Sequence, residues 1–439
     1  MSTDEVLVGV DLGTTGTKAV LTSPDGETLA FAQSATLWTT TGEGRQESTG
    51  RAMTEGVLRA VTAALADLAE RTGRRPGVAA LGIAGLAESG AVLDAHGEEV
   101  SPVMAWFDDR GTQQLRELPD ELRAELPRRT GLPLGPQPTF AKLLWLRDKG
   151  FRLTPASRWL TVPELVAWHL TGVQAAEPSL ASRTGLLDQA TGTPWPEALA
   201  AVGAPSGFLP PLVPAGTAIG RVRGTGADQL DGALLTVAGH DHPVAAVGVG
   251  ATNADDLLDS CGTAEVLLRS VPRLLDDDER ATLVRHGIEV GRHVLAGQSA
   301  LLGSLRTGLL LSQVVSLEGA DAREARDALD RRWSPTVRAG AASAQDDAWA
   351  AALSQTAHEA ATLLVRMQEV VGDHASAVAA GGWTRLRSVR ETRTAVVPRL
   401  RFSPIREPGA RGAALLAACA ATGRPAVDVL PGLAAARDE

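Results

Sequence analysis

A short pattern occurs twice in the chain, and this repeat constrains the fold more than any other feature of the sequence. Val6–Asp11 is typical of a buried strand, Gly13–Gly16 of a tight turn, and Lys18–Thr22 of a returning strand. Asp256–Leu268 repeats this shape around a Ser-Cys-Gly-Thr turn. Because 439 residues exceed what one ordinary core holds, the repeat predicts two lobes that each begin with a hairpin.

The first turn has chemistry suited to a polyphosphate. The run Asp11–Gly16 (DLGTTG) offers small residues, backbone N–H groups and two hydroxyls. The carboxylate of Asp11 can hold Mg²⁺, directly or through water. A glycine hairpin that binds no ligand would account for the sequence of this segment equally well. The chain has no GxxxxGK[ST] sequence, so a P-loop fold is not supported.

Asp241 stands where an open α/β sheet carries its chemistry. The stretch Ala238–Ala251 (AGHDHPVAAVGVGA) follows the short apolar strand Ala233–Val237, and Pro243 then opens a small-residue helix. This order puts Asp241 at the carboxyl end of a strand, just past the middle of the chain, where a two-lobed protein places its cleft. We interpret Asp241 as a catalytic base and the two flanking histidines as its structural neighbours.

The segment SPVMAWFDDR suits a polyhydroxylated ligand. If it is extended, Trp106, Asp108 and Arg110 lie on one face. The aromatic ring would then pack on C–H groups while the two charges bridge hydroxyls. Glu88 follows the predicted strand Val78–Gly85 and can reach the same end of the first lobe. The alternative is a surface Asp–Arg pair beside a half-buried tryptophan.

Periodicity predicts the remaining elements. Ser376–Ala380 is a buried strand that ends at Gly381-Gly382, where two glycines admit close approach of a flat ligand such as adenine. A simple strand-to-helix turn accounts for these glycines as well. The last predicted helix is rich in small residues and can pack tightly on a sheet. The predicted helices are Thr54–Thr72, Gly111–Thr130 with interruptions at Pro119 and Pro127, Thr139–Lys149, Leu160–Gly172, Gly297–Val315, Asp346–Val371 and Glu407–Ala421.

Composition narrows the partner and the compartment. The net charge of −10 argues against nucleic acid or an anionic membrane as main partner, but not against ATP, which backbone groups and a metal ion hold locally. Two cysteines, Cys261 and Cys419, are too few for a disulfide framework and fit a reducing cytoplasm. The acidic N-terminus lacks a signal pattern, and no apolar run reaches membrane-spanning length. We expect a cytoplasmic globular protein with a small-molecule substrate, compatible with a homodimer.

Together these motifs resemble those of the FGGY carbohydrate kinases, which share a fold with actin and the heat-shock chaperone ATPases. The matches occur in family order over nearly the whole chain. They are DLGTTGTKA at Asp11–Ala19, WFDDR at Trp106–Arg110, TGLP at Thr130–Pro133, KLLWL at Lys142–Leu146, LTG at Leu170–Gly172, GHD at Gly239–Asp241, GTA at Gly262–Ala264, GG at Gly381–Gly382 and GARGAALLA at Gly409–Ala417. The resemblance implies a two-lobed ribonuclease H-like α/β fold with the active site in the cleft between the lobes. Residues 1–248 would form the sugar-binding and catalytic lobe, and residues 249–439 the nucleotide-binding lobe.

The resemblance also implies roles for individual residues. The implied reaction is ATP- and Mg²⁺-dependent phosphorylation of a hydroxyl of a small sugar or polyol, with a pentulose or polyol favoured. Asp241 becomes the base and Asp11 the carboxylate associated with the metal. The implied nucleotide contacts are Asp11, Gly13, Thr14, Thr15, Lys18, Gly262, Thr263, Gly381 and Gly382. The implied sugar contacts are Glu88, Trp106, Asp108, Arg110 and Asp241.

The chain departs from the family pattern in its sugar site and in its second lobe. Ala87-Glu88 stands where glycerol kinases carry Arg-Glu, Gln137 stands where they place a tyrosine, and the Met-His pair of xylulokinases is absent. WTRLRSV after Gly382 differs from the commoner polar run, and the second lobe is short. The identity of the sugar therefore stays open. Two further hypotheses stay open as well: an actin-like or chaperone-like ATPase, which has no need of WFDDR, and a catalytically weak, sugar-sensing member of the same fold.

Overall fold

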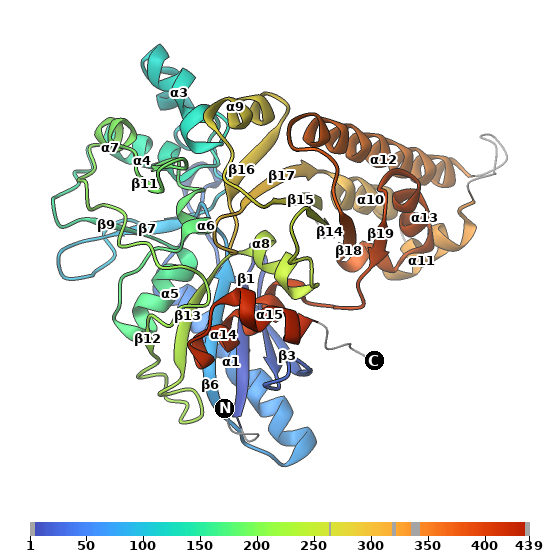
Figure 1. Ribbon diagram of the computed structural model, residues 1–439, viewed down its shortest axis with the longest axis horizontal. Helices are drawn as coiled ribbons and strands as arrows, with labels where there is room; N and C mark the ends of the chain where they lie inside the picture. Colours follow the sequence, from blue (N-terminus) through green and yellow to red (C-terminus); the bar gives the residue numbers. More distant parts are fainter. Residues whose placement is uncertain (1–4, 263–264, 318–321, 335–342, 435–439) are drawn as a thin grey trace.

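The structure, a computed structural model, describes residues 5–262, 265–317, 322–334 and 343–434. Within these residues the strands form two six-stranded sheets and three smaller ones, with helices packed on the large sheets (Figure 1). The first large sheet has the order β12-β13-β6-β1-β2-β3. Its strands are β1 (Glu5–Leu12), β2 (Gly16–Thr22), β3 (Thr28–Ala35), β6 (Gly77–Gly85), β12 (Gly220–Arg221) and β13 (Leu234–His240).

The first sheet opens with an antiparallel meander of β1, β2 and β3, whose first pair is the predicted hairpin, and β6 and β13 then join it in parallel to β1. Helices α1 (Gly50–Thr72) and α5 (Val162–Thr171) cover one face of this sheet. The apolar stripe of α1, which includes Val57 and Val61, is fully buried there. Thr49 caps the helix, since its side chain accepts a hydrogen bond from the first turn. The helix therefore begins four residues before its predicted start at Thr54 and ends at Thr72, as predicted.

Helix α14 (Pro408–Thr422), from the end of the chain, returns to the first sheet and covers its other face. Gly9 and Gly82 lie beneath it, and a β-carbon on either glycine would overlap a backbone carbonyl of the helix. The small residues therefore let α14 pack directly on the sheet backbone, as predicted. Helix α15 (Ala426–Ala434) packs beside α14. The domain boundary after residue 248 stays a prediction. This boundary separates the strands of the two large sheets, but α14, which follows it in the chain, packs on the first sheet.

The second large sheet has the order β16-β17-β15-β14-β18-β19. Its antiparallel pair β14–β15 repeats the pair β1–β2, as predicted. The predicted helix over Gly297–Val315 is wrong in its first half, because Ser299–Leu305 forms strand β17 and the helix begins only at Thr307. A short apolar run fits a strand or a helix, and here β17 hydrogen-bonds to β15 on one edge and β16 on the other. The other strands and the helices of this half are β14 (Asp256–Cys261), β15 (Glu265–Val271), β16 (Ile288–Arg292), β18 (Ser376–Ala380), β19 (Leu400–Phe402), α9 (Asp277–Arg285), α10 (Thr307–Ser316), α11 (Ala322–Arg332), α12 (Ala344–Val371) and α13 (Arg387–Val396).

Helix α8 (Asp241–Gly248) lies between the two large sheets. On one side Val244 packs with residues of α14. On the other side Ala245 and Ala246 pack against the second sheet. The first residue of α8 is Asp241, so this carboxylate stands where the two halves of the molecule meet.

A smaller helical region with its own core, which includes Phe140 and Trp159, occupies much of the chain between β8 and β12. Helix α5 begins two residues after its predicted start because Thr161 and Glu164 form a capping box. No helix in the described part of the chain is long and apolar enough to cross a membrane. The elements not yet named are β4 (Thr39–Thr40), β5 (Gln46–Ser48), β7 (Gly90–Leu93), β8 (Val103–Met104), β9 (Arg158–Thr161), β10 (Leu187–Asp188), β11 (Thr193–Pro194), α2 (Thr112–Arg116), α3 (Asp120–Thr130), α4 (Thr139–Asp148), α6 (Pro178–Ala181), α7 (Pro196–Val202) and the 3₁₀ turns η1 (Gly42–Gly44) and η2 (Gly382–Arg385).

Candidate active site between the two sheets

A cavity of about 320 Å³ lies between the two halves of the molecule. Three parallel strands of the first sheet, β1, β6 and β13, end at its rim, because the carboxyl ends of parallel strands meet at one edge. The first half contributes Thr14, Leu86, Ala87, Glu88, Trp106, Gln137, Arg183, His240, Asp241 and His242. The second half contributes Ser260, Gly262, Val266, Glu289, Leu302 and Ser304.

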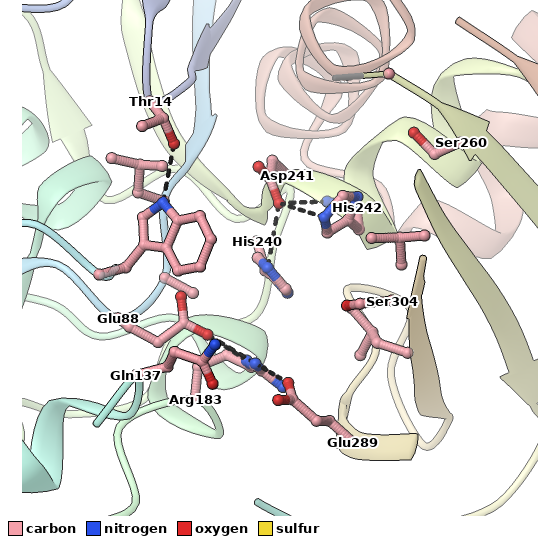
Figure 2. A pocket seen from close by; sticks show the side chains of 16 residues that line it. Thr14, Glu88, Gln137, Arg183, His240, Asp241, His242, Ser260, Glu289 and Ser304 are labelled. Atoms are coloured by element: carbon pink, nitrogen blue, oxygen red, sulfur yellow. Dashed lines mark hydrogen bonds and ion pairs between the residues drawn. The ribbon is translucent and has the colours of Figure 1, made fainter. Parts of the chain in front are cut away.

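Asp241 is held as an ionised carboxylate at the start of α8. Its Oδ1 accepts a hydrogen bond of 2.7 Å from the backbone N–H of His242, and Nε2 of His240 lies 3.1 Å away (Figure 2). Burial raises the pKa of Asp241, but the neighbouring His242 and His240 outweigh burial and hold that pKa below its ordinary value. The carboxylate can therefore accept a hydrogen bond from a hydroxyl in the cavity.

Asp11 has the environment of a carboxylate that needs a cation. Its Oδ1 is buried and has no hydrogen-bond partner among the described residues. Burial and repulsion from Asp241 raise the pKa of Asp11 to about 7, against an opposing effect of Lys18, with a smaller rise from Glu407. Two carboxylates that repel each other around an unpartnered oxygen fit Mg²⁺, which prefers oxygen ligands. Gly409, near the start of α14, permits this position, because a β-carbon there would lie 2.5 Å from Asp11 Oδ2.

The two predicted phosphate hairpins face each other across Asp241. Figure 2 shows Thr14 and Ser260 on opposite sides of this carboxylate. The turn after β1 is closed by a 3.1 Å bond from Gly13 N to Gly16 O. Gly262 lines the cavity on the second side, and Thr263 lies outside the described residues.

The other predicted nucleotide residues lie outside the cavity lining. Thr15 is exposed. Lys18 forms a 2.7 Å ion pair with Glu407. Gly381 has a φ of +111°, and a β-carbon there would overlap the backbone of Cys261, so the end of β18 lies against the second hairpin. A β-carbon on Gly382 would meet open space. The structure thus explains why residue 381 is a glycine. The role of both glycines toward adenine stays a prediction.

The segment around Trp106 is not extended, which corrects the expected common face. It turns, with a 3.1 Å bond from Asp108 N to Ala105 O, because the Asp108 carboxylate also accepts the backbone N–H of Arg110. Both carboxylate oxygens of Asp108 accept bonds of 2.8 Å from the Arg110 guanidinium. This buried pair lies outside the cavity lining, so we assign Asp108 and Arg110 to the support of the loop. Lys142 adds to that support by donating to the carbonyls of Trp106 and Asp108 at 3.3 and 2.5 Å.

Trp106 itself lines the cavity, and its indole N–H donates to Thr14 Oγ1 at 2.9 Å. Glu88 also lines the cavity, as expected for a sugar contact, and Gln137 does too. Sequence reasoning missed the cavity residues Arg183 and Glu289. Both lie in stretches without a recognisable motif, and the only available signal was a lone arginine among small and hydroxyl residues.

The comparisons with known proteins agree with this geometry. Residues 6–248 match the model of the N-terminal domain of the FGGY family of carbohydrate kinases. A glycerol kinase of Thermus brockianus is 31% identical over 342 residues, 73% of this chain and 67% of that protein. A xylulose kinase of Klebsiella pneumoniae is 29% identical over 284 residues, covering 62% of this chain and 56% of that one. An L-fuculokinase of Escherichia coli K12 is 30% identical over 184 residues, 41% of this chain and only 39% of that protein.

Solved structures show the same fold at lower identity. The structure of a xyloylose kinase from Brucella ovis superposes with a TM-score of 0.84 at 21% identity, over 97% of this chain and 92% of that one. A Plasmodium falciparum glycerol kinase with ADP gives a TM-score of 0.81 at 16% identity, over 98% and 92% of the two chains. The predicted two-lobed α/β fold of the sugar kinases is thereby confirmed. With its first half matched to the family model and its whole length sharing the fold, the chain belongs to the FGGY family of carbohydrate kinases.

Proposed function

We propose that this chain transfers the γ-phosphoryl group of ATP to a hydroxyl of a small sugar or polyol, with Asp241 as base. The observation that carries this proposal is the place of Asp241: it is ionised, lines the cavity and stands between the two glycine hairpins. Phosphoryl transfer needs mainly positioning and charge stabilisation, which a fixed carboxylate between two phosphate grips can supply.

Each side chain then has a definite task. Asp241 accepts the hydrogen bond of the attacking hydroxyl, orients its oxygen and takes its proton as the new bond forms. Thr14 and Gly262, which line the cavity, and Thr263 would be the phosphate contacts. The N–H groups of Gly13 and Gly262 are already bonded within their own turns, so the Thr14 hydroxyl is the donor nearest to hand. Asp11 would hold Mg²⁺, which neutralises phosphate charge when it is bound. Gly381 and Gly382 would lie on the adenosine side.

The acceptor belongs to the class suggested by the relatives' names, which include glycerol kinase, xylulose kinase and apulose kinase. We favour a pentulose or a polyol. A cytoplasmic location and a homodimeric assembly form part of this proposal, and both are open to measurement by fractionation and by light scattering.

The test is the formation of ADP from ATP and Mg²⁺ over a panel of pentuloses, hexuloses, polyols and aldonates. We expect ADP to form quickly only with an acceptor, since a cleft that excludes water protects ATP from hydrolysis. Equal ADP release with and without every acceptor would instead indicate an ATPase of the actin or chaperone type. Sugar binding without any ADP would indicate a sensing member of the family.

A further inference from the structure

Arg183 is clamped between two carboxylates that come from different halves of the molecule. Its Nε donates to Glu88 Oε1 at 2.8 Å, and its Nη2 lies 2.7 Å from the same oxygen and also binds Glu289. Glu88 follows β6 of the first sheet, whereas Glu289 belongs to β16 of the second. We call Arg183, Glu88 and Glu289 the arginine clamp. It is the point at which both halves reach one cationic group in the cavity wall.

The clamp fixes the guanidinium but does not use all its donors. Arg183 is 6% exposed, and its Nη1 is buried without a hydrogen-bond partner among the described residues. Oε1 of Glu88 accepts both bonds of the guanidinium, so the guanidinium does not occupy the other oxygen of this carboxylate. Figure 2 shows the clamp and Asp241 on opposite sides of His240, so the two can contact different ends of one small molecule.

The charges around the cavity are unbalanced toward the negative. Glu88, Glu289 and Asp241 carry three formal negative charges, and Arg183 carries one positive charge. A protonated histidine beside Asp241 adds one positive charge, and the lining then still carries one formal negative charge in excess. A carboxylate on the substrate would add a further negative charge inside a confined space, where repulsion is weakly screened.

We propose that Arg183 is the specificity-determining residue of the acceptor site: it donates to an oxygen of a neutral polyol or ketose, and its clamp rejects aldonates. This inference rests on the proposed function for the identity of the site, but it concerns binding and can be measured without turnover. A guanidinium held by two carboxylates is oriented and already neutralised, so it can donate to a hydroxyl or carbonyl without attracting an anion.

The test compares ligands that differ only at one end. Xylitol with xylonate, and sorbitol with gluconate, exchange a terminal CH₂OH for a carboxylate, and xylulose adds a ketose. Calorimetry measures their dissociation constants for the full chain, beside those of ATP. We expect the wild type to bind a neutral ligand at least about tenfold more tightly than its matched aldonate. Equal or tighter aldonate binding, or no neutral ligand bound, would overturn the inference.

Three variants test whether the arginine clamp is the cause of this preference for neutral ligands. Arg183→Met should weaken the neutral ligand by about 10- to 100-fold, the range for a lost charge-assisted hydrogen bond, with ATP binding unchanged. Glu289→Gln keeps the guanidinium and should reduce the preference for the neutral ligand by about tenfold. The matched control is Arg292→Met, since Arg292 also links β16 to the first half, by a 2.6 Å bond to Gln189 O, but lies outside the cavity lining. It should leave the preference within about twofold of the wild type.

The outcomes separate this inference from the proposed function. Selective binding of neutral ligands without any ADP formation supports the clamp and refutes the kinase activity. Equal rates of ADP formation from ATP with sorbitol and with gluconate as acceptor support the kinase and refute the clamp. If Arg183→Met loses its cooperative thermal transition, Glu289→Gln decides, and an unchanged preference in that variant refutes the inference.

Discussion

Asp241→Asn isolates the charge of the catalytic carboxylate from its shape. The amide oxygen of asparagine can still accept the 2.7 Å hydrogen bond from His242 N, so the start of α8 should keep its conformation. What is lost is the negative charge that accepts the proton of the attacking hydroxyl. A general base contributes about 10²- to 10⁴-fold in rate. At 1.36 kcal/mol for each factor of ten, the variant should raise the activation barrier by about 2.7 to 5.4 kcal/mol.

The assay is initial ADP formation at saturating ATP and acceptor, with binding of both ligands measured by calorimetry. Binding should change by less than about threefold, because the lost charge matters most in the transition state. His240→Gln is the matched control, since it alters the environment of Asp241 while the carboxylate remains. Turnover of Asp241→Asn within about threefold of the wild type would refute the assignment of Asp241 as base.

Three further predictions follow from the same geometry. The pKa of Asp11 is raised to about 7, so the stability it contributes is present below its unfolded value and is lost as the pH rises through about 7. Mg²⁺ should therefore raise the Tm more at pH 8 than at pH 5, and an equal rise at both values, or the same pattern in Asp11→Asn, would contradict a metal at Asp11. Asp108→Ala should destabilise the protein by about 1 to 3 kcal/mol in urea unfolding, because Arg110 loses both bonds to Asp108 and keeps only Glu47 as an ion-pair partner. A stability within about 1 kcal/mol of the wild type, with only the sugar KM altered, would restore Asp108 as a sugar ligand. Ser179→Ala removes the 2.9 Å hydrogen bond from His240 N to Ser179 Oγ, and should lower kcat about tenfold while KM for ATP stays constant. An unchanged kcat would mean that the backbone before Asp241 needs no such anchor.

The sequence was sufficient for those parts of the site that rest on local chemistry. The two hairpins and the strand that ends at Asp241 are specified by short apolar runs and glycine turns, which act over a few residues. The same local logic predicted that Trp106 and Glu88 face the cavity. The extended conformation assumed for the segment around Asp108 is wrong, because it competes with a turn that the Asp108 carboxylate stabilises, and the role of Asp108 toward the sugar stays a prediction.

Long-range packing explains what the sequence could not predict. Arg183 and Glu289 are separated by 106 positions, and their contact exists only because β16 packs beside the loop after α6. Strand β17 was mistaken for helix because an apolar run of seven residues fits either structure until its neighbours are known. No local sequence pattern indicated that β17 would pair with β15 and β16.

The contact of α14 with the first sheet also bears on how the chain folds during synthesis. Gly9 is synthesised about 400 residues before its partner Ala410. Until then one face of β1 and β6 lacks its final cover, although the face beneath α1 can already be buried. The nascent chain must therefore carry a half-covered sheet through most of its translation, which exposes it to aggregation and makes it a candidate for chaperone binding. A stop codon before Pro408 would remove the cover altogether, so α14 is as much a part of the first sheet's folding unit as the strands themselves.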